Sequence, residues 1–63
     1  MRVGSLVQVI NYDGYLEAHL IGQIGLVLKI KPSLARKEKN CFWVLMPNEE
    51  LEVFYQEELE EIS

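Results

Sequence analysis

Two apolar runs separated by a short polar connection constrain the fold of this chain more than any other feature. The runs Phe42–Met46 and Leu51–Tyr55 are rich in aromatic and β-branched residues, which favour strands. The four residues between them, PNEE, carry a proline and an asparagine at positions suited to a tight turn. The pattern therefore predicts an antiparallel hairpin with strands over 41–47 and 51–55.

Three further strands are expected on similar grounds. Residues 6–10 and 24–30 are rich in aliphatic and β-branched side chains, and Pro32 is expected to end the second run because proline lacks a ladder donor. After the hairpin, a short 3₁₀ turn over 56–58 and a last strand over 59–62 would bury two apolar residues. An amphipathic helix from residue 55 to residue 62 is the alternative for this acidic end.

The remaining segments are interpreted as connections. Residues 11–23 form a long loop whose Tyr15, Leu16 and Leu20 are expected to pack onto the body, and the charged residues 32–40 form a mobile loop. Gly22 and Gly25 are interpreted as having a conformational role, because glycine would let the long loop turn sharply and the following strand bend.

Five short strands separated by turn signals within 63 residues predict an all-β protein with a single small β-barrel domain over residues 1–63. Alternation along the strands, together with the apolar residues of the acidic end, gives the expected core. It consists of Val7, Val9, Ile24, Val27, Ile30, Phe42, Val44, Met46, Val53, Leu59 and Ile62.

The order of these segments resembles a known family. The stretches GSLVQVI, GQIGLVLKI, FWVLMP and FYQEELEEI are similar to SH3-like barrels of the KOW-related kind. This group includes the ferredoxin-docking subunit of photosystem I, the variable chain of ferredoxin–thioredoxin reductase, and small bacterial and phage proteins. The resemblance implies a five-stranded SH3-like barrel with a long first loop and a short 3₁₀ turn before the last strand. Because the fold hosts many activities, it implies no single function.

Charge is distributed unevenly along the chain. The net charge is −4, seven of the ten acidic residues follow position 48, and five of the six basic residues lie between positions 29 and 39. An acidic chain lacks the basic face that a dedicated nucleic-acid binder carries. Weak nucleic-acid binding through the basic segment remains an alternative, with Trp43 and Tyr55 as stacking platforms. Its phosphate-binding residues would be Lys29, Lys31, Arg36, Lys37 and Lys39.

The continuous apolar run from residue 41 to residue 47 cannot alternate cleanly between core and solvent. If its even-numbered members fill the core, Trp43 and Leu45 face outward. Such a face is either covered by the chain's own long loop or exposed as a protein interface, where tryptophan and tyrosine are enriched. The candidate partner-binding residues are Trp43, Leu45, Tyr15, Tyr55, Leu26 and Leu28.

Catalytic chemistry is poorly supported. The chain has one cysteine and one histidine, Cys41 and His19, and nothing in their context brings them together as nucleophile and base. Asp13, Glu17 and His19 form the one ligand-like cluster, which we interpret as solvated loop residues. Cys41 is expected to be buried and inert. We therefore expect no enzyme activity, cofactor or metal.

These observations favour a non-catalytic interaction module or accessory subunit that binds a protein through the outward aromatic and aliphatic residues. Self-association into a homo-oligomer through the same residues is a further expectation. A structural piece of a larger assembly, such as a phage particle, is another alternative. No apolar run approaches the roughly 18 residues that span a bilayer, and MRVGSLVQVI lacks the features of a signal peptide, so a cytoplasmic location and no membrane partner are expected.

Overall fold

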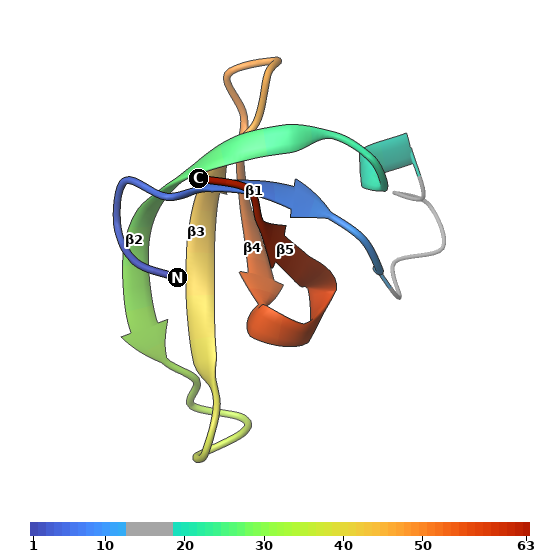
Figure 1. Ribbon diagram of the computed structural model, residues 1–63. Helices are drawn as coiled ribbons and strands as arrows, with labels where there is room; N and C mark the ends of the chain where they lie inside the picture. Colours follow the sequence, from blue (N-terminus) through green and yellow to red (C-terminus); the bar gives the residue numbers. More distant parts are fainter. Residues whose placement is uncertain (13–18) are drawn as a thin grey trace.

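The computed structural model describes residues 1–12 and 19–63 and contains five β-strands in one antiparallel sheet (Figure 1). The sheet order is β4-β3-β2-β1-β5. The elements are β1 (Leu6–Val9), β2 (Ile24–Pro32), β3 (Asn40–Leu45), β4 (Leu51–Tyr55), the 3₁₀ turn η2 (Gln56–Glu58) and β5 (Leu59–Glu61). The all-β class is therefore confirmed.

The C-terminal half follows the sequence prediction closely. The β3–β4 hairpin, the 3₁₀ turn over 56–58 and the strand that follows it are all present, so the helix considered for 55–62 is wrong. The Glu58 carboxylate accepts a hydrogen bond from the Tyr55 backbone N–H at 2.8 Å, which holds the 3₁₀ turn against the end of β4. β2 is longer than predicted because Pro32 is its last residue and still pairs with Asn40. A proline is tolerated at the end of a strand because only one ladder donor is lost there.

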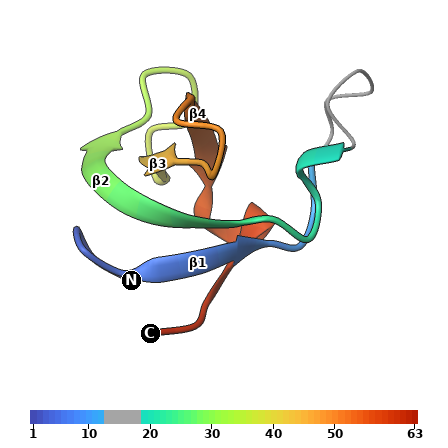
Figure 2. The same ribbon diagram turned by 90° about the horizontal axis from the view of Figure 1, so that it is seen from above.

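The long strand β2 joins the two parts of the sheet. Its first residues pair with β1 and the stretch from Leu26 to Pro32 pairs with β3, so the sheet curves along β2 (Figure 2). The register shifts between Val27 and Lys29, which leaves Leu28 as the extra residue of a bulge. The shift lets Val27 and Ile30 both point inward although they are three residues apart. Ile30 is half-buried and packs against the core.

The buried side chains form one cluster on the inner side of the sheet. It comprises Val7, Val9, Leu20, Val27, Phe42, Val44, Met46, Phe54 and Leu59. The prediction was wrong for Ile24, Val53 and Ile62, which are 47%, 42% and 50% exposed. It also missed Phe54. Leu20 packs onto the body as expected, whereas Tyr15 and Leu16 lie outside the described residues.

The two glycines of the GQIG stretch act differently. Gly22 has a φ of +93°, a backbone conformation that favours glycine, and it forms the turn into β2. Gly25 is buried at an inward position where a Cβ would clash with Val44 Cγ1 and lie 2.7 Å from the Leu45 carbonyl oxygen. Its role is therefore the close approach of β2 to β3. Because Gly25 occupies the inward position, its neighbour Ile24 points outward.

The sheet order leaves β4 and β5 as edge strands. Within residues 1–12 and 19–63, the sheet is thus not closed, and the barrel implied by the family resemblance is not confirmed.

Candidate interaction face

The outward side of β2, β3 and β4 carries three adjacent cross-strand pairs between β3 and β4. These pairs are Cys41 with Tyr55, Trp43 with Val53, and Leu45 with Leu51. Lys29 and Lys31 extend the same side on β2, opposite Trp43 and Cys41. We call this surface the outer face. It consists of Leu26, Leu28, Lys29, Lys31, Cys41, Trp43, Leu45, Leu51, Val53 and Tyr55.

One row of the outer face continues onto β1. Leu51 pairs with Leu45, Leu45 pairs with Leu26, and Leu26 in turn pairs with Leu6. The two ends of this leucine row, Leu51 and Leu6, are 52% and 42% exposed. Four leucines in register on the outward side of four strands contribute nothing to the inner core, so another surface must cover them to bury them fully.

Five of the six predicted partner-binding residues therefore lie together on the outer face: Leu26, Leu28, Trp43, Leu45 and Tyr55. Leu28 reaches it as the bulge residue and has no partner on β3. The sixth, Tyr15, lies outside the described residues. The predicted covering residue Leu20 belongs to the inner core instead.

The sequence prediction missed Leu51 and Val53 because it used the wrong hairpin register. Met46 donates its backbone N–H to the Glu50 carbonyl at 2.9 Å, so only three residues, 47–49, form the turn. Glu49 has a φ of +67°, as expected at the end of a three-residue loop. A four-residue connection would pair Met46 with Leu51 and would place Val53 inward. The one-residue shift exchanges the two faces of β4.

A shallow groove of about 690 Å³ lies at one end of the outer face. Its sheet residues include Trp43, Val53 and Tyr55, and Pro32 to Ala35 form its other wall. Leu34 in this wall is fully exposed. The groove therefore continues the apolar character of the face to the loop after β2.

The loop after β2 is held by specific contacts, although the sequence indicated a mobile segment. The Ser33 hydroxyl oxygen accepts hydrogen bonds from the backbone N–H groups of Ala35 and Arg36 at 3.2 and 3.0 Å. The same hydroxyl lies 3.3 Å from the Tyr55 hydroxyl, which ties the loop to the end of β4. Ser33 is buried as a result.

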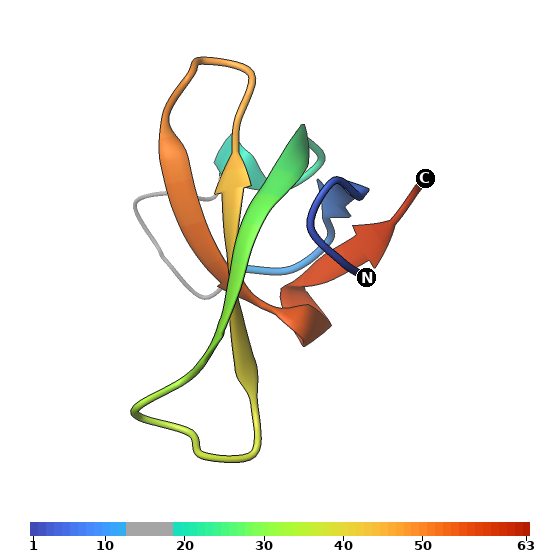
Figure 3. The ribbon, with the colours of Figure 1, turned by 90° about the vertical axis from the view of Figure 1, so that its left-hand side faces the viewer.

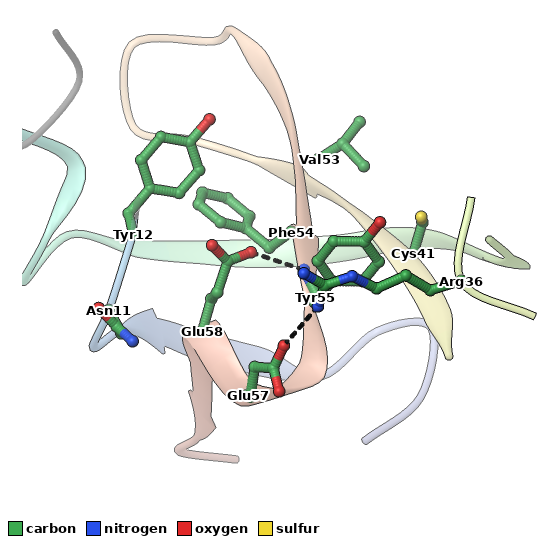
Figure 4. A pocket seen from close by; sticks show the side chains of 9 residues that line it. All are labelled: Asn11, Tyr12, Arg36, Cys41, Val53, Phe54, Tyr55, Glu57 and Glu58. Carbon is green, nitrogen blue, oxygen red and sulfur yellow. Dashed lines mark hydrogen bonds and ion pairs between the residues drawn. The ribbon is translucent and has the colours of Figure 1, made fainter. Parts of the chain in front are cut away.

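Two cations of the predicted nucleic-acid set are used within the fold. Lys39 Nζ lies 2.6 Å and Arg36 Nη1 3.3 Å from the Glu57 carboxylate. Both cations also lie over the Tyr55 ring, with the Arg36 guanidinium 4.8 Å from its centroid (Figure 4). The hydrogen bond from Lys39 and the two positive charges lower the pKa of Glu57. Arg36, Tyr55 and Glu57 also line a second depression of about 570 Å³ beside β4.

Lys29 and Lys31 differ from these two cations because neither is part of an ion pair within the described ranges. Lys29 Nζ instead lies 5.7 Å from the centroid of the Trp43 ring, which places its charge over β3. The Lys31 ammonium lowers the pKa of Lys29, because it can donate a hydrogen bond only to the neutral Lys29 amine and because its positive charge disfavours a second one nearby. The β2 side of the outer face therefore carries positive charge that no ion pair within these ranges neutralises.

The hairpin end beyond Leu45 is acidic. Glu49 lies in the turn 47–49, Glu50 follows it opposite the inward Met46, and both are exposed. In the described part of the chain, neither is part of an ion pair. The loop 33–39 and the turn 47–49 lie at opposite ends of β3 (Figure 3).

A second group of exposed aliphatic side chains lies on the outward side of the β1 half of the sheet. It comprises Leu6, Ile10, Ile24 and Ile62, which range from 42% to 50% exposed. The sequence prediction placed Ile24 and Ile62 in the core and therefore did not anticipate this surface. It contains no aromatic side chain.

The remaining candidate residues show no common site. Cys41 is half-buried on the outer face rather than buried, and His19 is exposed. Among the described residues, no group of three or more His, Cys, Asp or Glu side chains could hold a metal ion. Asp13 and Glu17 lie outside these residues. Over the same ranges, no helix has the length and apolar character needed to cross a membrane.

Comparisons with known proteins identify no relative. No family model, no curated protein and no solved structure matches the chain. The relationship to SH3-like barrels therefore stays a prediction, and the arguments about function rest on the outer face itself.

Proposed function

We propose that the chain is a small, non-catalytic protein-interaction module or accessory subunit that binds another polypeptide through its outer face. The observation that carries the proposal is the set of three adjacent cross-strand pairs in which Trp43, Leu45 and Tyr55 face Val53, Leu51 and Cys41 on the outward side. The fold proposed for the module is the SH3-like barrel. The long first connection and the 3₁₀ turn before β5 support it, because the resemblance implies both.

The composition of the face supports a protein partner. Large exposed apolar groups that adjoin one another on a soluble domain are typical of interaction sites, and tryptophan and tyrosine carry much of the binding energy where they occur. Trp43 is half-buried between Lys29 and Val53, so its ring is already oriented by its neighbours. A partner would lose little side-chain entropy in ordering it.

Nucleic-acid binding has weaker support. Arg36 and Lys39 are neutralised by Glu57, and both lie over the Tyr55 ring that was expected to stack on bases. The ammonium group of Lys29 occupies a position over Trp43. Phosphate groups and bases would have to displace these internal contacts, whereas an apolar protein surface could pack beside them.

Site-specific photo-crosslinking in cells that express the chain tests the proposal. A benzophenone amino acid at position 43 is expected to form adducts with a polypeptide, and mass spectrometry identifies the partner. The same group at Glu60, an exposed position on β5, is the matched control and is expected to give no such adduct. Equal labelling at positions 43 and 60, or no protein adduct at position 43, would overturn the proposal.

A further inference from the structure

We infer that the polypeptide bound by the outer face adds an extended segment to the free edge of β4, with apolar side chains on one side of that segment and basic side chains on the other. The inference rests on the proposed function and specifies the chemistry of the partner. It follows from the direction of the backbone groups of β4 and from the side chains beside them.

The hydrogen bonds of the β3–β4 hairpin show which backbone groups of β4 point away from β3. The Glu50 carbonyl oxygen accepts a hydrogen bond across the hairpin. Hydrogen-bonded and non-hydrogen-bonded positions alternate along an antiparallel pair, so Glu50 belongs to the hydrogen-bonded set and its neighbour Leu51 does not. Leu51, Val53 and Tyr55 therefore direct their N–H and C=O groups to the free side of β4.

Two of these residues offer backbone groups to a partner. The Tyr55 N–H already donates to the Glu58 carboxylate at 2.8 Å, which agrees with its direction away from β3. In the described part of the chain, no acceptor is bonded to the N–H of Leu51 or Val53, and no strand pairs with this side of β4. An extended polypeptide satisfies such groups with its own main chain. The other edge strand, β5, has only three residues, and two of them are glutamates.

The free edge of β4 borders an open space. The depression of about 570 Å³ beside β4 is lined by Val53, Phe54 and Tyr55 (Figure 4). These consecutive side chains alternate between the two sides of the strand, so the depression follows the strand edge instead of one face. Asn11 and Tyr12, which follow β1, also line it. A chain segment could therefore approach the backbone of β4 at this edge.

The side chains of β4 specify what the two sides of an added strand should carry. On the outward side, Leu51, Val53 and Tyr55 form an apolar surface. On the inner side, Glu50 and Glu52 carry negative charge. Side chains directly opposite each other on adjacent strands lie on the same side and interact as pairs. An extended segment that alternates apolar and basic residues therefore matches β4, and its apolar side would extend the outer face by one strand.

The same side chains disfavour β4 of a second copy as the added strand. If Leu51 and Val53 of two antiparallel copies formed hydrogen bonds with each other, the two Glu52 side chains would lie directly opposite. Like charges in that arrangement are destabilising. The net charge of −4 also makes two copies repel each other, whereas it attracts a basic segment.

A short blocked peptide in which lysine and valine alternate is the probe for this edge. At physiological ionic strength we expect it to bind the full chain with a Kd below about 1 mM, measured by NMR titration. Near saturation, the amide hydrogen exchange of Leu51 and Val53 is expected to slow at least about fivefold, because the peptide becomes the acceptor for both N–H groups. The Glu61 N–H, which faces the free side of β5, is the control and is expected to exchange at an unchanged rate.

Matched peptides and variants test the side-chain chemistry. Replacing every lysine of the peptide by glutamate, or every valine by serine, is expected to weaken binding at least about tenfold. Glu50→Lys is expected to raise the Kd of the lysine–valine peptide about fivefold. Glu60→Lys makes the same change in net charge on β5 and is expected to leave this Kd within about twofold, because salt screens distant charges.

Failure of the inference can be distinguished from failure of the proposed function. The inference would be overturned by a lysine–valine peptide that does not bind at about 1 mM, or that binds without slowing the exchange of Leu51 and Val53. Equal affinity for the lysine and glutamate peptides would overturn it as well. Position-43 adducts with a polypeptide would leave the proposed function intact in each of these cases, whereas the absence of such adducts would overturn the proposed function itself.

Discussion

Leu26 on β2 lies opposite Leu45 on β3, and both side chains point away from the core. The same Leu26 pairs with Leu6, so the contact belongs to a leucine row across four strands. Exposing such an apolar row to water is unfavourable in free energy, and covering it with another surface would be favourable. The row and the adjoining Trp43 are the structural basis for assigning a binding role to the outer face.

The hairpin register can be tested through the two faces of β4. Phe54→Ala is expected to cost about 3–5 kcal/mol of unfolding free energy, because Phe54 is buried in the core. Val53→Ala should cost less than about 1 kcal/mol under monomeric conditions, since Val53 is 42% exposed. Urea unfolding followed by circular dichroism measures both. A larger loss for Val53→Ala than for Phe54→Ala would refute the register.

Gly25→Ala tests the close approach of β2 to β3. The added methyl would clash with Val44 and with the Leu45 carbonyl, and backbone cannot move aside cheaply. We expect a loss of about 1–3 kcal/mol of unfolding free energy, as for overpacked cores. Thermal unfolding of the variant and of the wild type, measured under the same conditions, gives this difference in stability. A variant that is as stable as the wild type would show that the strands are farther apart at this point.

The attachment of the loop after β2 is expected to depend on pH. Its contacts with Arg36 and Lys39 lower the pKa of Glu57, so they stabilise the fold fully above the ordinary glutamate pKa of about 4.3. That contribution is lost as the pH falls through the lowered pKa. Amide hydrogen exchange of residues 35–39 should therefore accelerate in acid, relative to intrinsic rates. In Glu57→Gln the exchange should already be fast at neutral pH, and unchanged protection in this variant would contradict the assignment.

Several elements could be predicted from the sequence because their signals are local. Pro47 and Asn48 mark the turn before β4, and the acidic stretch after Tyr55 forms the 3₁₀ turn and β5 where expected. Which side chains of each strand point toward the core could not be predicted as reliably from the sequence. The face of β4 depends on whether the turn has three or four residues, and the positive φ of Glu49 is not evident from its residue type.

The outer face was predicted in part for the same reason. The outward positions of Trp43 and Leu45 follow from the even-numbered residues of the apolar run 41–47 filling the core, and that inference needs only alternation within one strand. The prediction put Ile24 in the core because a hydrophobic pattern does not count glycine as a core residue. In the structure Gly25 occupies the inward position, so Ile24 points outward. The bulge at Leu28 arises from pairing between strands, which no pattern within β2 specifies.

Nucleic-acid binding gives a further prediction. With Arg36 and Lys39 paired to Glu57, the chain is expected to show no measurable affinity for single-stranded oligonucleotides at low salt, where electrostatic binding is strongest. Fluorescence anisotropy of labelled DNA and RNA provides the measurement. Salt-sensitive binding that Lys37→Glu weakens would instead support a role for the basic loop.

The central claim, that another polypeptide covers Trp43, is tested most directly by the fluorescence of this residue, the one tryptophan in the chain. Acrylamide quenching and emission are measured for the chain alone and with the polypeptide identified by crosslinking at position 43, after subtraction of that polypeptide's own signal. We predict that quenching of Trp43 falls and its emission shifts to shorter wavelength in the complex. Emission and quenching of Trp43 that the polypeptide leaves unchanged would contradict the claim.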